Sequence, residues 1–350
     1  MFLTGNSHMK RIVSGTRGIN NLRDFGKYVI APLAGQKLDD TALELIHDYG
    51  VSSFILFKRN LVDLSEAKEL CDRIDTACIK AGLGHALFAI DQEGGPVQRL
   101  VVPDYPKIPS NKQVSLDRNP WQQLFRQASL AVSTLKILGI KLNLAPVLDL
   151  ADDSCNDVLF DRSYGIDANK TALLGSIYLS LLTQSGIATC AKHFPGIGAV
   201  RHDPHKETGW VSLDSDQLKM HLLPFAVAIR SGVPAIMTSH VVFKVLDSLP
   251  VTYSYLIAHD LLREKLGFKG VLITDDLEMK GAGEESVASA AVKAFKAGHD
   301  LLLICQSQNE VKETISLLSE SVSSREISSD RLEISSKRIF ALKSKFGLIT

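Results

Sequence analysis

Eight short apolar stretches, each separated from the next by a longer segment, constrain the fold of this chain more than any other feature. The stretches are nearly continuous in Val, Ile, Leu and Ala, as expected for strands that are covered on both faces. They occupy residues 28–33, 53–57, 85–91, 140–148, 188–194, 235–241, 270–276 and 300–305. Eight successive β-then-α units predict an α/β fold, the (β/α)8 TIM-type barrel, with a doubly wound parallel sheet as the alternative.

The segments between these stretches predict crossover helices. Helical patterns lie at residues 38–49, 64–81, 119–138, 168–185, 214–231, 284–297 and 308–323. Asn119 and Asp214 precede two of them as N-caps, and the amphipathic segment 331–346 predicts a closing helix on the outside of the barrel. Because no Pro- or Gly-rich linker divides the chain, we expect a single barrel domain over residues 25–350 with a C-terminal helical tail, preceded by an N-terminal extension of residues 1–24.

Composition excludes several classes of protein. Of the 350 residues, 45% are hydrophobic, which is ample for a large core. Lys plus Arg and Asp plus Glu both number 39, so the charge favours neither nucleic acid nor a membrane as a partner. No apolar stretch approaches the ~18 residues that a membrane helix needs. The five cysteines are widely spaced without a Cys-x-x-Cys pair, which favours a cytoplasmic protein without a disulfide framework or thiolate zinc site.

Polar side chains follow the predicted strands at their C-terminal ends, where parallel barrels build their active sites. Asp91 ends the third stretch, Lys192 and His193 lie in the fifth, and Asp275 and Asp276 end the seventh. This convergence of carboxylates, a lysine and histidines predicts a site for a polyol or a sugar. The alternative for the Lys192-His193 pair is a partly buried charge that is paired with a nearby strand-end Asp.

The two aspartates that follow the seventh stretch have a competing explanation. An Asp at a strand-to-helix turn commonly caps the helix, because its carboxylate accepts the free N–H groups there. Two consecutive residues that leave a strand point in different directions. We therefore predict that Asp275 faces the barrel axis and that Asp276 supports the wall.

The loop at residues 196–210 is the most unusual stretch of the chain. It is rich in glycine and carries Asp203 two positions before His205. An Asp so placed can accept the imidazole N–H, orient the ring and raise its basicity, which is the arrangement of an acid/base dyad. Two alternatives remain at this point: an exposed polar loop with an incidental Asp and His, and a metal site at His202 and His205 that lacks an obvious third ligand.

Several stretches, in order along the chain, resemble glycoside hydrolase family 3, and within it the single-domain bacterial β-N-acetylglucosaminidases of peptidoglycan recycling. They are ILFKRN (55–60), DQEGGPVQR (91–99), NLAPVLDL (143–150), DRSYG (161–165), AKHFPG (191–196), DPH (203–205), MTSHV (237–241) and GFKGVLITDDLEMKGA (267–282). The KHFPG and ITDDLEM stretches are specific, whereas a lone Asp-x-His would not be.

The resemblance implies a role for each matching residue. Asp275 would be the nucleophile, His205 the general acid/base and Asp203 its orienting partner. The hydroxyls of the terminal sugar would be held by Asp91, Arg99, Arg162, Lys192 and His193. The implied reaction is the retaining removal of terminal non-reducing β-linked N-acetylglucosamine from muropeptides through a covalent glycosyl-enzyme. No metal or cofactor is expected, the partner is a small carbohydrate, and we expect a monomer.

The sequence departs from the family pattern at three positions. Ile197 stands where the family usually has His, Pro96 where Arg is frequent, and Pro204 where the dyad segment usually has Ser. These changes keep the dyad residues but affect loop rigidity and the leaving-group side of specificity. Alternatives within the enzyme class are a family 3 β-glucosidase and a β-N-acetylglucosaminide phosphorylase, and from another class a non-catalytic sugar-binding barrel.

Overall fold

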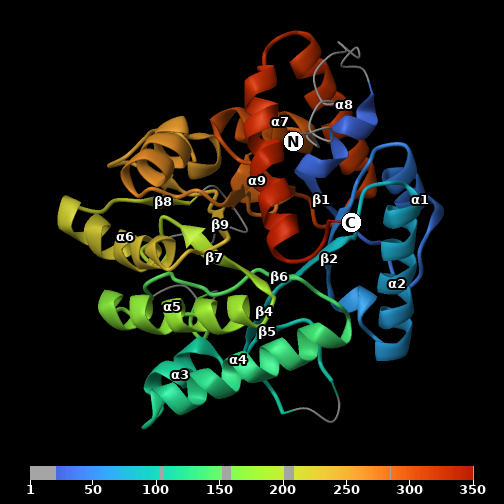
Figure 1. Cartoon of the computed structure of the whole chain (residues 1–350). Coiled ribbons are helices and arrows are strands. Elements are labelled where there is room, and N and C mark those ends of the chain that lie inside the picture. Colours follow the sequence, from blue (N-terminus) through green and yellow to red (C-terminus); the bar gives the residue numbers. More distant parts are fainter. Residues whose placement is uncertain (1–20, 103–105, 152–158, 201–208, 284, 350) are drawn as a thin grey trace, which may run out of the picture.

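The computed structural model describes residues 21–102, 106–151, 159–200, 209–283 and 285–349. Its centre is a sheet of eight parallel strands, surrounded by helices (Figure 1). The strands are β1 (Val29–Pro32), β2 (Ser53–Leu56), β3 (Leu87–Ile90), β6 (Leu142–Asn143), β7 (Ala188–Phe194), β9 (Ala235–Thr238), β11 (Val271–Ile273) and β12 (Leu302–Leu303). Each lies within one of the eight apolar stretches.

The strand order closes the sheet into a barrel. Neighbours follow the chain from β1 through β2, β3, β6, β7 and β9 to β11, and β12 pairs with β1. A parallel bridge between Ile273 and Leu301 joins the two remaining edges, and Thr274 N donates to Leu301 O at 3.1 Å. A doubly wound sheet would leave these edges open. The prediction of a (β/α)8 barrel is therefore confirmed.

The predicted helices are present, most with slightly shorter limits and α8 with the predicted ones. They are α1 (Asp40–His47), α2 (Leu64–Lys80), α4 (Pro120–Ile137), α5 (Ala168–Gln184), α6 (Ser215–Arg230), α7 (Val287–Ala297) and α8 (Gln308–Ser323). Asn119 caps α4 and Asp214 caps α6 through their side chains, as predicted. A short helix, α3 (Asn111–Leu116), also precedes α4.

The crossover between β9 and β11 is a helix that the sequence pattern did not reveal. Leu256–Lys265 forms a helix with π-type hydrogen bonding. Its buried residues recur five apart, as Ile257 with Leu262 and Ala258 with Arg263. A search for apolar residues at the α-helical period misses this spacing.

The fourth apolar stretch gives a shorter strand than predicted. Only Leu142 and Asn143 form β6, and the stretch rejoins the sheet at a bridge between Val147 and Lys192. Pro146 lies between β6 and Val147. It has no N–H to donate to a neighbouring strand, and this interrupts the strand. Four short strands outside the barrel sheet form two minor pairs: β4 (Gln92–Gly94) with β5 (Val97–Gln98), and β8 (Trp210–Val211) with β10 (Val242–Phe243).

The closing helix α9 (Ser329–Lys345) packs against the N-terminal ends of the strands. Arg338 Nη1 lies 3.2 Å from Asp300 Oδ1, just before β12. Lys343 Nζ donates to Ser52 Oγ at 2.8 Å, just before β2. This helix therefore covers the end of the barrel opposite to the polar strand ends.

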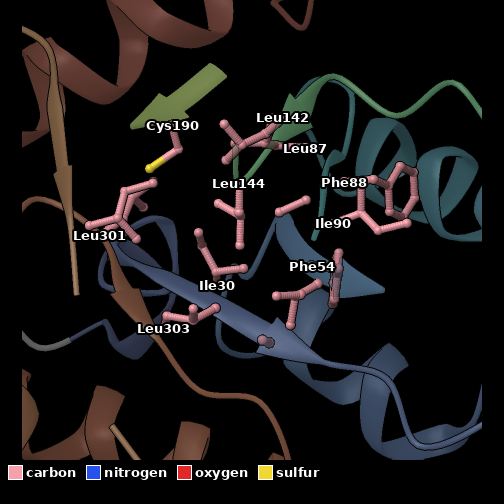
Figure 2. Packing of buried hydrophobic residues seen from close by; sticks show 14 of the residues in the cluster. Ile30, Phe54, Leu87, Phe88, Ile90, Leu142, Leu144, Cys190, Leu301 and Leu303 are labelled. Atoms are coloured by element: carbon pink, nitrogen blue, oxygen red, sulfur yellow. The ribbon is translucent and has the colours of Figure 1, made fainter. Parts of the chain in front are cut away.

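The barrel core is apolar. Ile30, Leu144 and Leu303 are almost fully buried and pack with residues from neighbouring strands (Figure 2). This packing fixes the strand ends that carry the polar residues. Cys71, Cys78, Cys190 and Cys305 are buried free thiols, and Cys155 lies outside the described residues. Among the helices described, none combines the length and apolar character needed to cross a bilayer.

Candidate active site

A cavity of about 390 Å³ opens at the C-terminal ends of the strands. Its volume lies at the lower end of the range of small-molecule sites, about 300–1,000 Å³, which suits one sugar ring better than several. Its polar lining comes from six strand ends or the loops after them, and comprises Asp91, Glu93, Arg99, Arg162, Lys192, His193, Ser239, His240, Asp275, Asp276 and Gln306. The structure thus brings together all the predicted site residues that it describes.

Lys192 is the centre of a buried charge cluster in the cavity wall. Its Nζ lies 2.7 Å from Asp91 Oδ1 and 2.7 Å from Glu93 Oε1. On the other side of Glu93, Arg162 donates from Nε at 2.8 Å and from Nη2 at 2.9 Å, a two-pronged contact. The cluster joins the ends of β3 and β7 to the loop after β6.

The cluster keeps all of its members charged at neutral pH. Burial alone would raise the pKa of Asp91 and of Glu93, but the neighbouring cations hold both pKa values below the ordinary range. Lys192 and Arg99 act on Asp91, and Arg162 and Lys192 on Glu93. Burial would lower the pKa of Lys192, yet the two carboxylates raise it. Two fixed anions therefore face the cavity as acceptors for hydroxyl groups, and two fixed cations face it as donors.

Asp149 orients His193. The buried carboxylate of Asp149 lies 2.6 Å from His193 Nδ1 and accepts the backbone N–H of Ile197 at 2.8 Å. Burial would raise the pKa of Asp149, but His193 and these backbone donors lower it. With Nδ1–H donating to Asp149, Nε2 is the ring nitrogen left for a ligand.

Asp275 lies in the cavity wall two residues after the end of β11, and Asp276 follows it. Asp275 Oδ1 accepts the N–H of Asp276 at 2.9 Å, and Asp276 Oδ1 accepts the N–H of Glu278 at 3.1 Å. Asp276 thus supports the turn, although it also lines the cavity. Burial, together with the charges of Asp275 and Glu278, raises the pKa of Asp276 to about 7.

Two buried polar atoms of the cavity residues have no protein partner in the described part of the chain. They are Arg99 Nε and Ser239 Oγ, and both are buried. Buried polar atoms normally have a hydrogen-bond partner. Both atoms are also closed to solvent, so a ligand would reach them only after the neighbouring side chains move.

Asp203 and His205, predicted as the acid/base pair, lie outside the described residues, as does His202 of the metal alternative. The start of their loop is described. Ile197 lines the cavity and is anchored on Asp149. A Cβ at Gly198 would lie 1.6 Å from Leu150 O, so the backbone here comes too close for any side chain.

Three buried residues of the site had no role assigned from the sequence: Glu93, Asp149 and His240. The signal for Glu93 was its place two residues after Asp91, at the C-terminal end of the third apolar stretch. His240 lies 2.7 Å from Thr252 Oγ1 and 2.9 Å from Asp276 O through its two ring nitrogens. Burial lowers its pKa, so this ring is a neutral support for the Asp276 backbone.

Comparison with known proteins agrees with the geometry. The family model described as the glycosyl hydrolase family 3 N-terminal domain matches residues 19–342. The chain belongs to glycoside hydrolase family 3. The family resemblance inferred from the sequence motifs is thus confirmed, and this family 3 chain is a glycoside hydrolase.

Two curated relatives of this family 3 chain are named beta-hexosaminidase. One from Glaesserella parasuis serovar 5 is 34% identical over 292 residues, which cover 82% of this chain and 83% of the relative. One from Neisseria meningitidis serogroup B is 33% identical over 298 residues, which cover 81% of this chain and 80% of the relative.

Solved structures of family 3 proteins share the fold. A β-N-acetylglucosaminidase from Paenibacillus sp. FPU-7 superposes with a TM-score of 0.89 and 33% identity over 93% of this chain, which spans 62% of that longer protein. NagZ from Neisseria gonorrhoeae, solved with N-trifluoroacetyl-D-glucosamine, gives a TM-score of 0.76 and 27% identity, covering 91% of this chain and 98% of NagZ.

Proposed function

We propose that this family 3 enzyme is a retaining exo-β-N-acetylglucosaminidase that removes terminal non-reducing N-acetylglucosamine from peptidoglycan fragments in the cytoplasm. The observation that carries the proposal is the position of Asp275 in the wall of a cavity sized for one sugar, together with a cluster of hydroxyl-binding charges. The names of the relatives favour an N-acetylhexosamine as that sugar.

The charged cluster would bind the non-reducing sugar. Asp91 accepts hydrogen bonds from sugar hydroxyls, while Arg99, Arg162 and Lys192 donate to their oxygens, and His193 contributes Nε2. Because these groups are held by one another before the sugar arrives, little rotamer entropy is lost on binding. A cavity filled by one ring explains the removal of terminal residues only.

The chemical steps follow from a nucleophile at Asp275. Its carboxylate attacks the anomeric carbon, the bond to the leaving oxygen breaks, and His205 donates the proton that this oxygen takes. The glycosyl ester on Asp275 is then attacked by water, whose proton returns to His205. Asp203 orients the imidazole in both steps. Two displacements at one carbon retain its configuration.

The first test compares p-nitrophenyl β-N-acetylglucosaminide with p-nitrophenyl β-glucoside, each with and without phosphate, for wild type and Asp275→Ala. We expect turnover of the N-acetyl sugar alone, independent of phosphate and absent in the variant, whose circular dichroism and Tm match the wild type. Preference for the glucoside would contradict the substrate, and formation of a sugar phosphate would contradict hydrolysis. Full activity of Asp275→Ala would contradict the mechanism.

The natural leaving group needs a separate experiment. Incubation with N-acetylglucosaminyl-anhydromuramyl peptides should release free N-acetylglucosamine, detected by liquid chromatography and mass spectrometry. Intact muropeptides beside rapid cleavage of the nitrophenyl substrate would place the natural substrate in another class of glycoside.

A further inference from the structure

The segment that carries Asp275 is fastened to the N-terminus of α8 by the side chain of Glu278. Its carboxylate accepts three successive backbone N–H groups: Cys305 at 2.9 Å, Gln306 at 2.5 Å and Ser307 at 3.0 Å. Ser307 is the N-cap of α8. We propose that Glu278 is a positioning residue for the reaction, which sets the orientation of the Asp275 carboxylate from this anchor. The proposal rests on the proposed role of Asp275 as nucleophile.

A continuous set of hydrogen bonds leads from the anchor to Asp275. The N–H of Glu278 donates to Asp276 Oδ1 at 3.1 Å, and the N–H of Asp276 donates to Asp275 Oδ1 at 2.9 Å. One oxygen of Asp275 is therefore held by the backbone of its neighbour, and the other is left for the sugar. Together with the bonds of His240 to Asp276 O at 2.9 Å and of Leu277 N to Leu303 O at 3.0 Å, Glu278 thus restrains the backbone that holds Asp275, and loss of its anchor would loosen that backbone from one side.

The start of the segment has its own attachments, which do not fix its end. Leu303 N donates to Thr274 Oγ1 at 2.9 Å, and Leu277 N donates to Leu303 O at 3.0 Å. These bonds continue the pairing of the strand ends as far as residue 277. Beyond that point, the carboxylate of Glu278 is the next attachment to the same neighbouring segment.

The choice of a carboxylate for this anchor has an electrostatic reason. The N-terminus of a helix offers free N–H groups and the positive end of the helix dipole, which together stabilise an anion. Glu278 is thereby held without Lys or Arg among its hydrogen-bond partners in the described structure. A cation there would lie close to Asp275 and weaken its carboxylate as a nucleophile.

The anchor also fixes part of the cavity wall. Cys305 and Gln306, whose N–H groups Glu278 accepts, both line the cavity, as does Asp275. Glu278 therefore ties the nucleophile segment to the wall beside it. Misplacing a reacting group by about 1 Å can cost on the order of 100-fold in rate, whereas sugar binding depends mainly on the separate charge cluster.

The test uses Glu278→Gln, which keeps the size of the side chain but turns an NH2 group toward a backbone donor, and Glu278→Asp, which keeps the charge but is shorter. The matched control is Glu310→Gln in the first turn of α8. The backbone N–H of Glu310 donates to Ser307 Oγ. With p-nitrophenyl β-N-acetylglucosaminide we expect kcat to fall about 10- to 100-fold for both Glu278 variants, with KM within about twofold of wild type. The control should keep the wild-type kcat.

Three results would overturn the proposal: a kcat of both Glu278 variants within twofold of wild type, a loss that appears in KM instead, or an equal loss in the control. A lower Tm with unchanged kcat at 25 °C would mean a structural role only. If Glu278→Gln does not fold, Glu278→Asp decides. Asp275→Ala is measured beside them, since its activity, and not that of the Glu278 variants, tests the nucleophile assignment.

Discussion

Replacing Lys192 by Met tests whether the buried charge cluster is as tightly balanced as the geometry indicates. Lys192 lies 2.7 Å from both Asp91 and Glu93, and its side chain is only 3% exposed. Removing one partner of a buried ion pair costs roughly 3–5 kcal/mol, because an uncompensated charge stays behind. Arg162 still compensates Glu93, and Arg99 Nη2 still lies 3.4 Å from Asp91 Oδ2, so Asp91 is left partly compensated and the loss should lie at the low end of this range. We therefore expect about 3 kcal/mol less free energy of unfolding at pH 7.5.

The loss must depend on pH in a definite direction. In the wild type the pKa of Asp91 is lowered, so its contribution to stability is present above the ordinary carboxyl pKa and disappears only as pH falls through the lowered value. Without Lys192, Arg99 alone opposes the effect of burial, so the pKa of Asp91 should rise relative to the wild type, and protonation then removes the poorly compensated charge. The destabilisation should therefore shrink between pH 7.5 and pH 5.

Urea unfolding followed by circular dichroism measures both effects. The control is Lys219→Met, which breaks an exposed ion pair with Asp216 and should change the free energy of unfolding by less than about 1 kcal/mol. An equal effect of the two substitutions would refute the reasoning. So would a Lys192→Met loss that grows as the pH is lowered.

Three further predictions concern the site and its surroundings. Because the pKa of Asp276 is raised to about 7, the free energy of unfolding of the wild type should fall as pH rises from about 4 to 7. Urea unfolding of Asp276→Asn should not show this contribution to the fall. Gly198→Ala should lower Tm by several degrees, because the added Cβ would lie 1.6 Å from Leu150 O. Gly35→Ala, which has open space around the added Cβ, should leave Tm unchanged. Equal Tm values of the two variants would contradict the steric argument. His205→Ala should lose less kcat on nitrophenyl substrates than on sugars with poor leaving groups, because protonation matters less there. Equal losses would mean a structural role for His205.

The sequence was sufficient to predict the barrel because strands covered on both faces have a nearly continuous apolar pattern. It also predicted which side chains share a site, since parallel strands place their C-terminal ends together. Asp91 and Lys192 are 101 residues apart, yet their positions at strand ends were enough to bring them into one cavity.

The individual partners could not be predicted. The two-pronged contact of Arg162 with Glu93 joins two residues 69 positions apart, and it depends on side-chain conformations that no local pattern encodes. The pairing of Asp149 with His193 has the same character. Glu278 lies in the ITDDLEM stretch, but its contacts could not be predicted, because its three partners are backbone N–H groups of a distant helix end, which have no sequence signature.

The central claim is that Asp275 forms a covalent bond to the sugar, and trapping that ester tests it most directly. Wild-type enzyme and Asp275→Ala are mixed with a 5-fluoro-N-acetylglucosaminyl fluoride, quenched in acid and analysed by intact-protein and peptide mass spectrometry. The account predicts one glycosyl adduct per wild-type chain, located at Asp275, and none in the variant. An adduct on another residue, or active wild-type enzyme that turns over this reagent without any adduct, would contradict it.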